Sequence, residues 1–230
     1  MKEKSDWRLE KIKLEEVSAM ITDFDRTITD EPGVVNEEVL REMKSLNKPL
    51  ILVTGRTLSY TKTLYKKYPI WDCIIGENGC FVYVPSNGLT WNFTSDEFEK
   101  AKKLLKDKHF PARFGSSVIS VSLNDKEKLF KVGNHFINDL TFKINVDEIM
   151  VLPKGIDKGR SLRMTLDYFG IDPKNTVIVG DGENDVDLFT VPGYKVAVAN
   201  AHEKLKAHAD EVTKKPSTQG VLEIIGKLKM

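Results

Sequence analysis

The stretch Val17-Ser18-Ala19-Met20-Ile21-Thr22-Asp23-Phe24-Asp25 is a short, mostly apolar run that ends abruptly in two aspartates. Such a run is typical of a buried strand in a parallel sheet, here with carboxylates at its carboxyl end. In open α/β sheets, ligands bind beyond the carboxyl ends of the strands. The chemistry of this protein is therefore expected where its strands end.

The next sixty residues alternate between helix and strand patterns. Asn36 can cap a helix whose apolar residues recur at helical spacing up to residue 46. Residues 49–53 form a second apolar run that ends in Thr54-Gly55-Arg56, and 57–68 can form a second helix. Residues 73–75 predict a third strand, ending in Gly76-Glu77-Asn78-Gly79. This order predicts an α/β protein with a Rossmann-like parallel sheet and helices on both faces.

The pattern changes at about residue 84. Asn87-Gly88 is a strong hairpin signal between the apolar runs 81–84 and 89–93. Helix patterns follow at 95–105 and 125–138, and strand patterns at 117–123 and 141–152. We therefore predict a small α+β cap domain at 84–151, inserted into a core of residues 1–83 and 152–230. Residues 1–16 are predicted to be a charged N-terminal extension.

The α/β pattern returns after the predicted cap. Residues 159–169 predict a helix that ends at Gly170, and 176–179 predict a strand that ends in Gly180-Asp181-Gly182-Glu183-Asn184-Asp185. A further strand at 194–198 and a helix at 221–228 complete the predicted core.

Composition restricts the classes of partner. The chain of 230 residues has 35 basic and 34 acidic residues, so its charge favours neither nucleic acid nor an anionic membrane. It has no apolar stretch of membrane-spanning length, and its charged beginning does not resemble a signal peptide. Its two cysteines predict neither a disulfide framework nor a zinc site. We expect a cytoplasmic protein with a small-molecule partner, and a homodimer is left open.

The strand ends gather oxygen ligands, namely Asp23, Asp25, Thr54, Asp181 and Asp185. Carboxylates collected in one crevice repel one another unless a cation neutralises them. Because the set contains no His or Cys, it suits Mg²⁺. The sequence therefore predicts a magnesium site.

A phosphate ester would use the remaining groups. Thr54 and the backbone N–H groups after Asp23 can bind phosphate oxygens, while Lys158 supplies a fixed positive charge. An aspartate can attack phosphorus to give an aspartyl-phosphate that water then hydrolyses. Asp25 is placed to protonate the leaving oxygen and later to activate water.

The segments 23–29, 54–56, 155–159 and 180–185 resemble, in order, the four motifs of haloacid-dehalogenase-like phosphatases. Glu77-Asn78-Gly79 and Val198-Ala199-Asn200-Ala201 resemble sequences of the Cof-like subfamily, whose cap follows the third core strand. Within that subfamily, a cap as short as this one is most similar to that of archaeal-type phosphoglycolate phosphatases. The resemblance covers nearly the whole core.

The resemblance implies a role for each matching position. Asp23 would be the nucleophile and a metal ligand, and Asp25 the acid/base, with its backbone carbonyl on the metal. Asp181 would bind Mg²⁺ directly, and Asp185 would bind the metal or orient its water. The phosphate-binding residues implied are Thr54, Gly55 and Lys158, with Asn184 hydrogen-bonding nearby.

One position departs from the family pattern, because Arg26 stands where the family has Gly. Arg must either adopt an ordinary backbone conformation there or strain the loop. The first hypothesis is a Mg²⁺-dependent phosphomonoesterase for 2-phosphoglycolate. The alternatives are a sugar-phosphate phosphatase, a phospho-accepting receiver, and a homologue that Arg26 has weakened catalytically.

Overall fold

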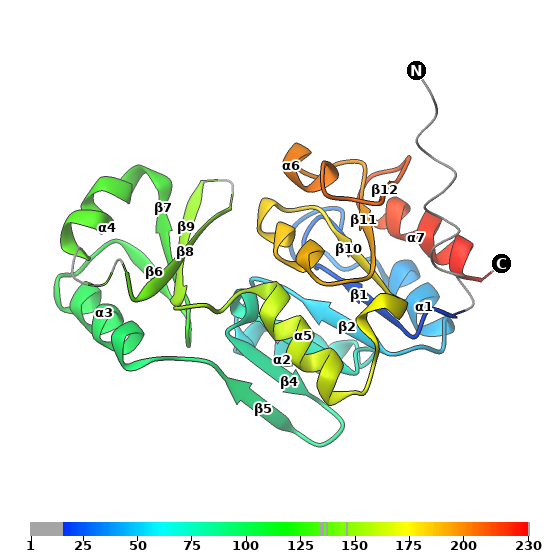
Figure 1. Cartoon of the computed structure of the whole chain (residues 1–230), viewed down its shortest axis with the longest axis horizontal. Coiled ribbons are helices and arrows are strands. Elements are labelled where there is room, and N and C mark those ends of the chain that lie inside the picture. Colours follow the sequence, from blue (N-terminus) through cyan, green and yellow to red (C-terminus); the bar gives the residue numbers. More distant parts are fainter. Residues whose placement is uncertain (1–15, 134–135, 137, 146, 230) are drawn as a thin grey trace.

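The computed structural model describes residues 16–133, 136, 138–145 and 147–229 (Figure 1). Within these ranges the chain forms two β-sheets with helices packed around them. The extension predicted for residues 1–16 lies, except for its last residue, outside the described residues. No helix in the described ranges is both long and apolar enough to cross a bilayer.

The larger sheet has, among the described residues, eight strands in the order β12-β11-β10-β1-β2-β3-β4-β5. The strands from β12 to β3 are parallel, whereas β4 and β5 are antiparallel and form one edge. Strands β1, β2 and β10 are entirely buried, which explains why their sequences are continuous apolar runs. The strands are β1 (Ala19–Thr22), β2 (Leu50–Val53), β3 (Cys73–Gly76), β4 (Phe81–Val84), β5 (Leu89–Asn92), β10 (Thr176–Gly180), β11 (Tyr194–Ala197) and β12 (Glu211–Val212).

The helices of this part of the chain begin at capping residues. Asn36 accepts hydrogen bonds from two backbone N–H groups at the start of α1, and Asp157 accepts one at the start of α5. Helix α1 packs against α7, while α2 and α5 contact β3. The helices are α1 (Glu37–Ser45), α2 (Leu58–Lys67), α5 (Lys158–Tyr168), α6 (Glu203–Lys206) and α7 (Ser217–Leu228). The prediction of an α/β fold with a mainly parallel core sheet is confirmed.

The smaller sheet forms a separate lobe beside the larger one (Figure 1). Its described strands, in the order β6-β7-β9-β8, are antiparallel throughout. Phe98 and Leu105 of one helix and Leu129 of another share an apolar core with the sheet. The elements are α3 (Asp96–Asp107), β6 (Ala112–Phe114), β7 (Ile119–Ser122), α4 (Lys126–Val132), β8 (Leu140–Asn145) and β9 (Glu148–Pro153).

The hairpin of β4 and β5 belongs to the larger sheet. Strand β4 pairs with β3, and β5 pairs with β4 from Leu89 to Asn92. The sequence placed residues 84–92 in the cap, because an antiparallel hairpin is untypical of a parallel core. We therefore propose that the inserted cap runs from about residue 93 to 153.

The shortest elements were not predicted from the sequence. Strands β6 and β12 and helix α6 have two to four residues, too few to show a hydrophobic period. The helix expected at 125–138 ends at Val132, where Gly133 follows, and residues 134, 135 and 137 of that range lie outside the described residues. Short 3₁₀ turns occur at Glu77–Gly79, Leu123–Asp125, Pro173–Asn175, Glu183–Val186 and Leu188–Thr190.

Polar contacts of Glu77 and Lys143 join the smaller sheet's lobe to the core. The buried carboxylate of Glu77 accepts hydrogen bonds from the backbone N–H groups of Ser116 (3.1 Å) and Ser117 (2.7 Å). The ammonium of Lys143 on β8 lies 2.8 Å from a carboxylate oxygen of Asp187. These contacts hold the lobe over the carboxyl ends of the core strands.

Candidate active site

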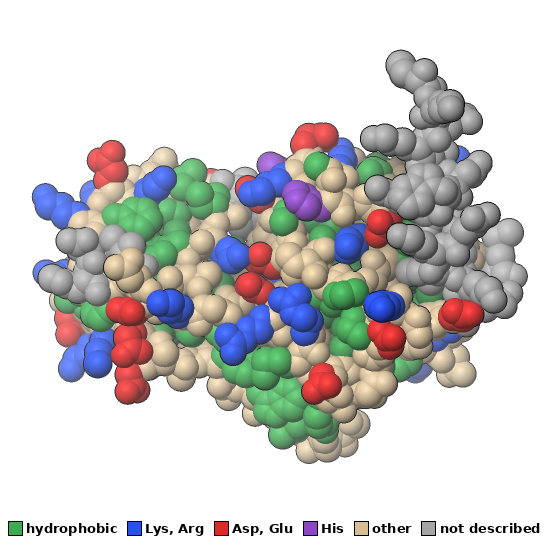
Figure 2. Space-filling model, in the orientation of Figure 1, with side chains coloured by type: hydrophobic (Ala, Val, Ile, Leu, Met, Phe, Trp, Pro, Cys, Tyr) green, Lys and Arg blue, Asp and Glu red, His purple; other side chains and the backbone are tan. Residues whose placement is uncertain are grey.

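A cleft of about 490 Å³ lies between the core and the smaller sheet's lobe. In Figure 2, basic and acidic side chains gather where the two lobes meet. The parallel pairing of β1 with β2 and β10 brings the ends of all three strands together. The predicted site residues that line the cleft are Asp23, Asp25, Thr54, Gly55, Asp181 and Asn184.

Three buried carboxylates form a cluster at one end of this cleft. One oxygen from each of Asp23, Asp181 and Asp185 lies within 4.8 Å of the others. The ammonium of Lys158, whose side chain is 1% exposed, donates hydrogen bonds to Asp23 (2.7 Å) and Asp185 (2.6 Å). Three carboxylates thus face a single buried ammonium.

The electrostatics of the cluster favour an added cation. Burial raises the pKa of Asp23 well above its ordinary value, and the nearby Asp185 adds to this, while Lys158 opposes it. Burial, with Asp185 second, raises the pKa of Asp181 to about 7. Burial lowers the pKa of Lys158, but Asp185 and Asp23 outweigh it and the net pKa is raised. Each shift reflects excess negative charge in a low-dielectric site.

Backbone hydrogen bonds fix Asp185 in the cluster. One of its oxygens accepts from the N–H groups of Asp181 (3.1 Å) and Gly182 (2.8 Å), and the other accepts from Lys158. Three of its about four lone-pair sites are therefore occupied, which fixes the orientation of the carboxylate beside its neighbours. Asp181 accepts a hydrogen bond from the hydroxyl of Thr27 at 3.0 Å.

The donor set fits a divalent cation that prefers oxygen. The cluster contains only carboxylates, and their mutual repulsion would be relieved by two positive charges. Asp23 and Asp181 would hold such an ion, with Asp185 beside them. The side chain of Asp25, predicted to be the acid/base, is not part of the cluster, and the metal contact predicted for this residue was through its backbone carbonyl.

Asp25 is bound by Arg56, a contact that the sequence did not predict. The guanidinium of Arg56 donates from Nε (2.8 Å) and Nη2 (2.7 Å) to the two oxygens of Asp25. The backbone N–H of Gly33 donates to the same carboxylate at 2.8 Å. In the sequence, Arg56 directly follows Thr54 and Gly55, the two residues of this segment that had predicted roles. This position was the only sequence signal for Arg56.

Asn184 contacts a second residue that had no predicted role. Its amide donates to the side-chain oxygen of Asn78 at 3.0 Å, and Asn78 donates to the sulfur of Met150 on β9 at 2.7 Å. The lobe contributes Arg113 and Glu148, an ion pair, to the same cleft. Arg113 lies on β6, Met150 and Glu148 lie on β9, and Asn78 lies in the turn after β3, so their mutual placement depends on the tertiary fold.

Comparison with known proteins agrees with this geometry. A model of haloacid dehalogenase-like hydrolases matches the chain over residues 20–139 and 93–225. The chain belongs to the haloacid dehalogenase-like hydrolase family. The resemblance found in the sequence motifs is thus confirmed.

Individual known proteins align with nearly the full chain. The chain is 28% identical over 218 residues to a phosphoglycolate phosphatase of Archaeoglobus fulgidus, covering 90% of this chain and 95% of that protein. The structure of Thermoplasma acidophilum 0175 has a TM-score of 0.79 at 18% identity, covering 93% and 98% of the two chains. The sucrose-phosphatase of Synechocystis sp. PCC6803 has a TM-score of 0.67 at 17% identity, covering 93% and 98%. The two solved structures share the fold over nearly the whole of this chain.

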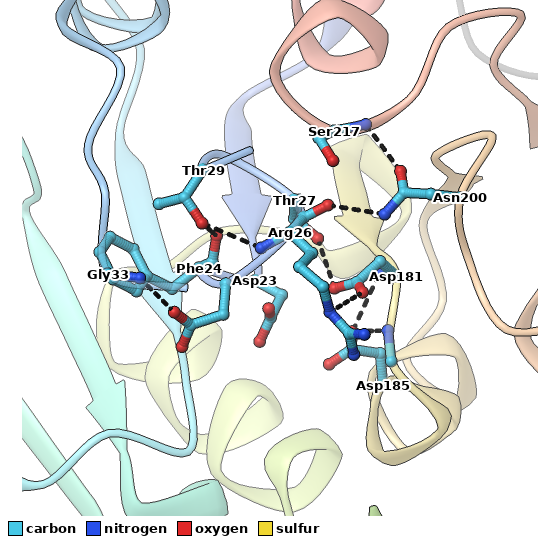
Figure 3. Close-up of polar contacts among 12 residues, drawn as sticks. Asp23, Phe24, Arg26, Thr27, Thr29, Gly33, Asp181, Asp185, Asn200 and Ser217 are labelled. Atoms are coloured by element: carbon cyan, nitrogen blue, oxygen red, sulfur yellow. Dashed lines mark hydrogen bonds and ion pairs between the residues drawn. The ribbon is translucent and has the colours of Figure 1, made fainter. Parts of the chain in front are cut away.

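Arg26 adopts the left-handed backbone conformation in this hydrolase. Its φ is 60°, a value that favours glycine and costs another residue about 1–2 kcal/mol. The backbone N–H of Arg26 donates to Thr29 (2.9 Å), and its carbonyl accepts from Asn200 (3.0 Å). Figure 3 shows the side chain reaching toward Asp181, with Nε 3.4 Å from the carboxylate. Of the two predicted alternatives, the strained loop is observed.

Magnesium should stabilise the protein through Asp181. The pKa of Asp181, about 7, exceeds the unfolded value, so its ionisation between about pH 4 and 7 destabilises the metal-free fold. At pH 8, Mg²⁺ at 100 times its Kd should add about 2.7 kcal/mol to the free energy of unfolding. Asp181→Asn should melt higher than the wild type without Mg²⁺ and lose most of the Mg²⁺-dependent shift.

Thermal unfolding with and without Mg²⁺ measures both effects. Glu183→Gln is the matched control, because Glu183 lies in the same turn but pairs with the surface residue Lys204. It should keep the full Mg²⁺ shift. An unchanged shift in Asp181→Asn would contradict the assignment of Asp181 to the metal site.

Arg26 should compete with the metal ion for Asp181. Its side chain is 47% exposed, so the pair contributes about 0.2–1 kcal/mol and its removal should tighten Mg²⁺ binding up to about fivefold. Arg26→Ala and Arg26→Gly should show the same gain in Mg²⁺ affinity. Only Arg26→Gly should also gain about 1 kcal/mol of stability, because only glycine relieves the left-handed backbone.

Titration calorimetry with Mg²⁺ and chemical denaturation separate these two effects of Arg26. Equal stabilities of the alanine and glycine variants would show that the loop carries no backbone strain. A weaker Mg²⁺ affinity in both variants would show that Arg26 supports the metal site.

Proposed function

We propose that this hydrolase is a Mg²⁺-dependent phosphomonoesterase that acts on 2-phosphoglycolate and releases glycolate and phosphate. The observation that carries the proposal is the buried Lys158, bonded to both Asp23 and Asp185 at the end of the cleft. A fixed cation beside a carboxylate nucleophile is suited to a dianionic phosphate. The family membership and the archaeal phosphoglycolate phosphatase relatives support the same reaction.

The reaction proceeds in two steps. In the first, a carboxylate oxygen of Asp23 attacks phosphorus, the bond to the ester oxygen breaks, and Asp25 gives its proton to the departing oxygen. In the second, water attacks phosphorus and gives a proton to Asp25, while the bond between phosphorus and Asp23 breaks. Phosphate leaves, and both aspartates return to their starting states.

The residues around the nucleophile bind and orient the phosphate group. Lys158 holds one oxygen of Asp23, which fixes the direction of attack, and its charge balances that of the phosphate. Thr54, at the end of β2, lines the cleft and is suited to donate its hydroxyl hydrogen to a phosphate oxygen. Bound Mg²⁺ would neutralise the developing negative charge on the transferred group. Gly55 leaves room for the side-chain amide of Asn78, since an added Cβ would lie 3.3 Å from that amide.

A sugar-phosphate phosphatase is the second candidate. The cleft of about 490 Å³ is larger than phosphoglycolate requires, and Arg113 and Glu148 offer it polar groups. The structural likeness to a sucrose-phosphatase extends over the cap as well as the core. A receiver is disfavoured, since the inserted lobe covers the phosphate-binding end of the sheet. A weakened homologue is disfavoured because Arg26 adopts the left-handed backbone that a glycine at this position would favour.

Substitution of the two aspartates tests the mechanism. Asp23→Asn should abolish turnover, because an amide cannot form the aspartyl-phosphate. Asp25→Asn should slow turnover by roughly 10² to 10⁴ but still phosphorylate Asp23. Release of phosphate from an aryl phosphate, and acid-stable phosphoprotein after quenching, measure the two effects. A loss below about tenfold in Asp23→Asn would remove that residue as the nucleophile.

A substrate panel tests the assignment of phosphoglycolate. We expect the wild-type kcat/KM to favour 2-phosphoglycolate over hexose phosphates and sucrose phosphate by at least about tenfold, or 1.4 kcal/mol of transition-state discrimination. All substrates are measured on one preparation with saturating Mg²⁺. A preference of the same size for the disaccharide phosphate would favour the sugar-phosphate phosphatase instead.

A further inference from the structure

Arg56 is the guanidinium closest to the predicted acid/base in the cleft. It binds both oxygens of Asp25 through Nε and Nη2, and its side chain is 34% exposed. It also lines the cleft between the core and the cap. Arg56 therefore connects the acid/base to the space that the leaving group would occupy.

The structure holds the guanidinium of Arg56 rigidly. Its Cζ lies over the ring of Tyr60, 4.8 Å from the ring centroid. The backbone N–H of Arg56 donates to the Thr54 hydroxyl (3.1 Å), and its carbonyl accepts from the N–H of Glu77 (3.0 Å). A planar fork held in this way loses little entropy when it binds a second carboxylate.

Arg56 retains donors for a second carboxylate. A guanidinium has five N–H hydrogens, and Asp25 engages one on Nε and one on Nη2. Within the part of the chain that the structure describes, no residue accepts a hydrogen bond from Nη1. The edge formed by Nη1 and the second hydrogen of Nη2 matches a carboxylate bidentately.

The other arginines of the cleft are less suited to a carboxylate on a compact substrate. Arg113 lies on the cap, is 75% exposed and forms an ion pair with Glu148, whose charge would repel a second carboxylate. Arg26 is directed toward Asp181 of the acidic cluster. Neither has a described contact with Asp25.

We propose that Arg56 determines substrate specificity by binding a carboxylate on the carbon next to the phosphate ester oxygen. This inference rests on the proposed phosphatase function. In 2-phosphoglycolate one methylene separates the ester oxygen from the carboxylate, so the receptor for that carboxylate must adjoin the group that protonates the ester oxygen. Arg56 meets this requirement, because it is hydrogen-bonded to Asp25.

The arrangement leaves Asp25 able to transfer a proton. A carboxyl group offers about four lone-pair sites, and Arg56 and Gly33 occupy three of them. The fourth can carry the proton for the leaving oxygen. When a substrate carboxylate is bound, the Arg56 guanidinium lies between it and Asp25. The positive charge reduces the repulsion between the two anions. The substrate class is therefore compact phosphomonoesters with an adjacent carboxylate.

Paired substrates separate recognition by Arg56 from its support of Asp25. The pair is 2-phosphoglycolate and 2-hydroxyethyl phosphate, in which a neutral hydroxymethyl group replaces the carboxylate. Replacement of Arg56 disturbs Asp25 for both substrates. The resulting decrease in kcat/KM is common to both and cancels in the ratio of their kcat/KM values. Arg56→Gln should reduce this ratio by at least about tenfold. Arg56→Lys should recover part of it, mainly through KM, because it keeps the charge without the fork.

Arg113→Gln is the matched control in the same cleft and should change the ratio by less than about threefold. A third substrate, 3-phosphooxypropionate, moves the carboxylate one methylene farther, and its ratio to 2-hydroxyethyl phosphate should be at least about tenfold lower than that of phosphoglycolate. All assays use the full chain with Mg²⁺, and thermal unfolding verifies that each variant is folded.

Three outcomes would overturn the proposal. The first is that both Arg56 variants keep the wild-type ratio of kcat/KM for 2-phosphoglycolate over 2-hydroxyethyl phosphate. The second is that this ratio falls in Arg113→Gln instead. The third is that the wild type shows no preference for the substrate with the carboxylate. In each case hydrolysis of the panel by the wild type would leave the phosphatase function standing. If the wild type hydrolyses none of the phosphomonoesters, the proposed function itself fails.

Discussion

The site depends on the balance between three buried carboxylates and the ammonium of Lys158. Burying an unpaired charge costs several kcal/mol, so Asp23 and Asp185 are tolerated only because Lys158 lies between them. The backbone N–H groups of Asp181 and Gly182 satisfy the remaining oxygen of Asp185. One buried ammonium and the half-exposed guanidinium of Arg26 leave the three carboxylates with a net negative charge, which a divalent cation would compensate. Burial, with the charge of Asp185 second, raises the pKa values of Asp23 and Asp181.

Sheet topology makes this balance attainable from residues far apart in the chain. Strand β1 lies between β10 and β2, with Thr22 paired to Val179 and to Leu52, so the residues that follow all three strands meet at one edge. Because the strands are buried on both faces, their positions are fixed by packing rather than by the site. The core can therefore hold mutually repelling groups in place without relaxing.

The sequence predicted what depends on local pattern and on this topological rule. Asp23, Thr54 and Asp181 were predicted because apolar runs identify the strands and the rule places their ends together. The pairing of Arg56 with Asp25 could not be predicted, since it joins two loops whose side-chain directions arise only from the packed fold. The left-handed conformation of Arg26 was one of two alternatives, because local preference disfavours it and only the surrounding hydrogen bonds stabilise it. The pairing of β4 and β5 with the larger sheet could not be predicted, because the hairpin pattern does not reveal which sheet its strands join.

The turn at Glu77–Gly79 links the smaller sheet's lobe to two loops that line the cleft. Its residues have φ values of 47°, 56° and 104°, and at Gly79 an added Cβ would lie 2.3 Å from the Asp157 carbonyl oxygen. Backbone strain of this kind persists only where surrounding contacts enforce it. Here the Glu77 N–H binds the Arg56 carbonyl, its carboxylate binds the cap backbone, and Asn78 contacts Asn184. One strained turn thus aligns the smaller sheet's lobe, the Arg56 loop and the loop that follows β10.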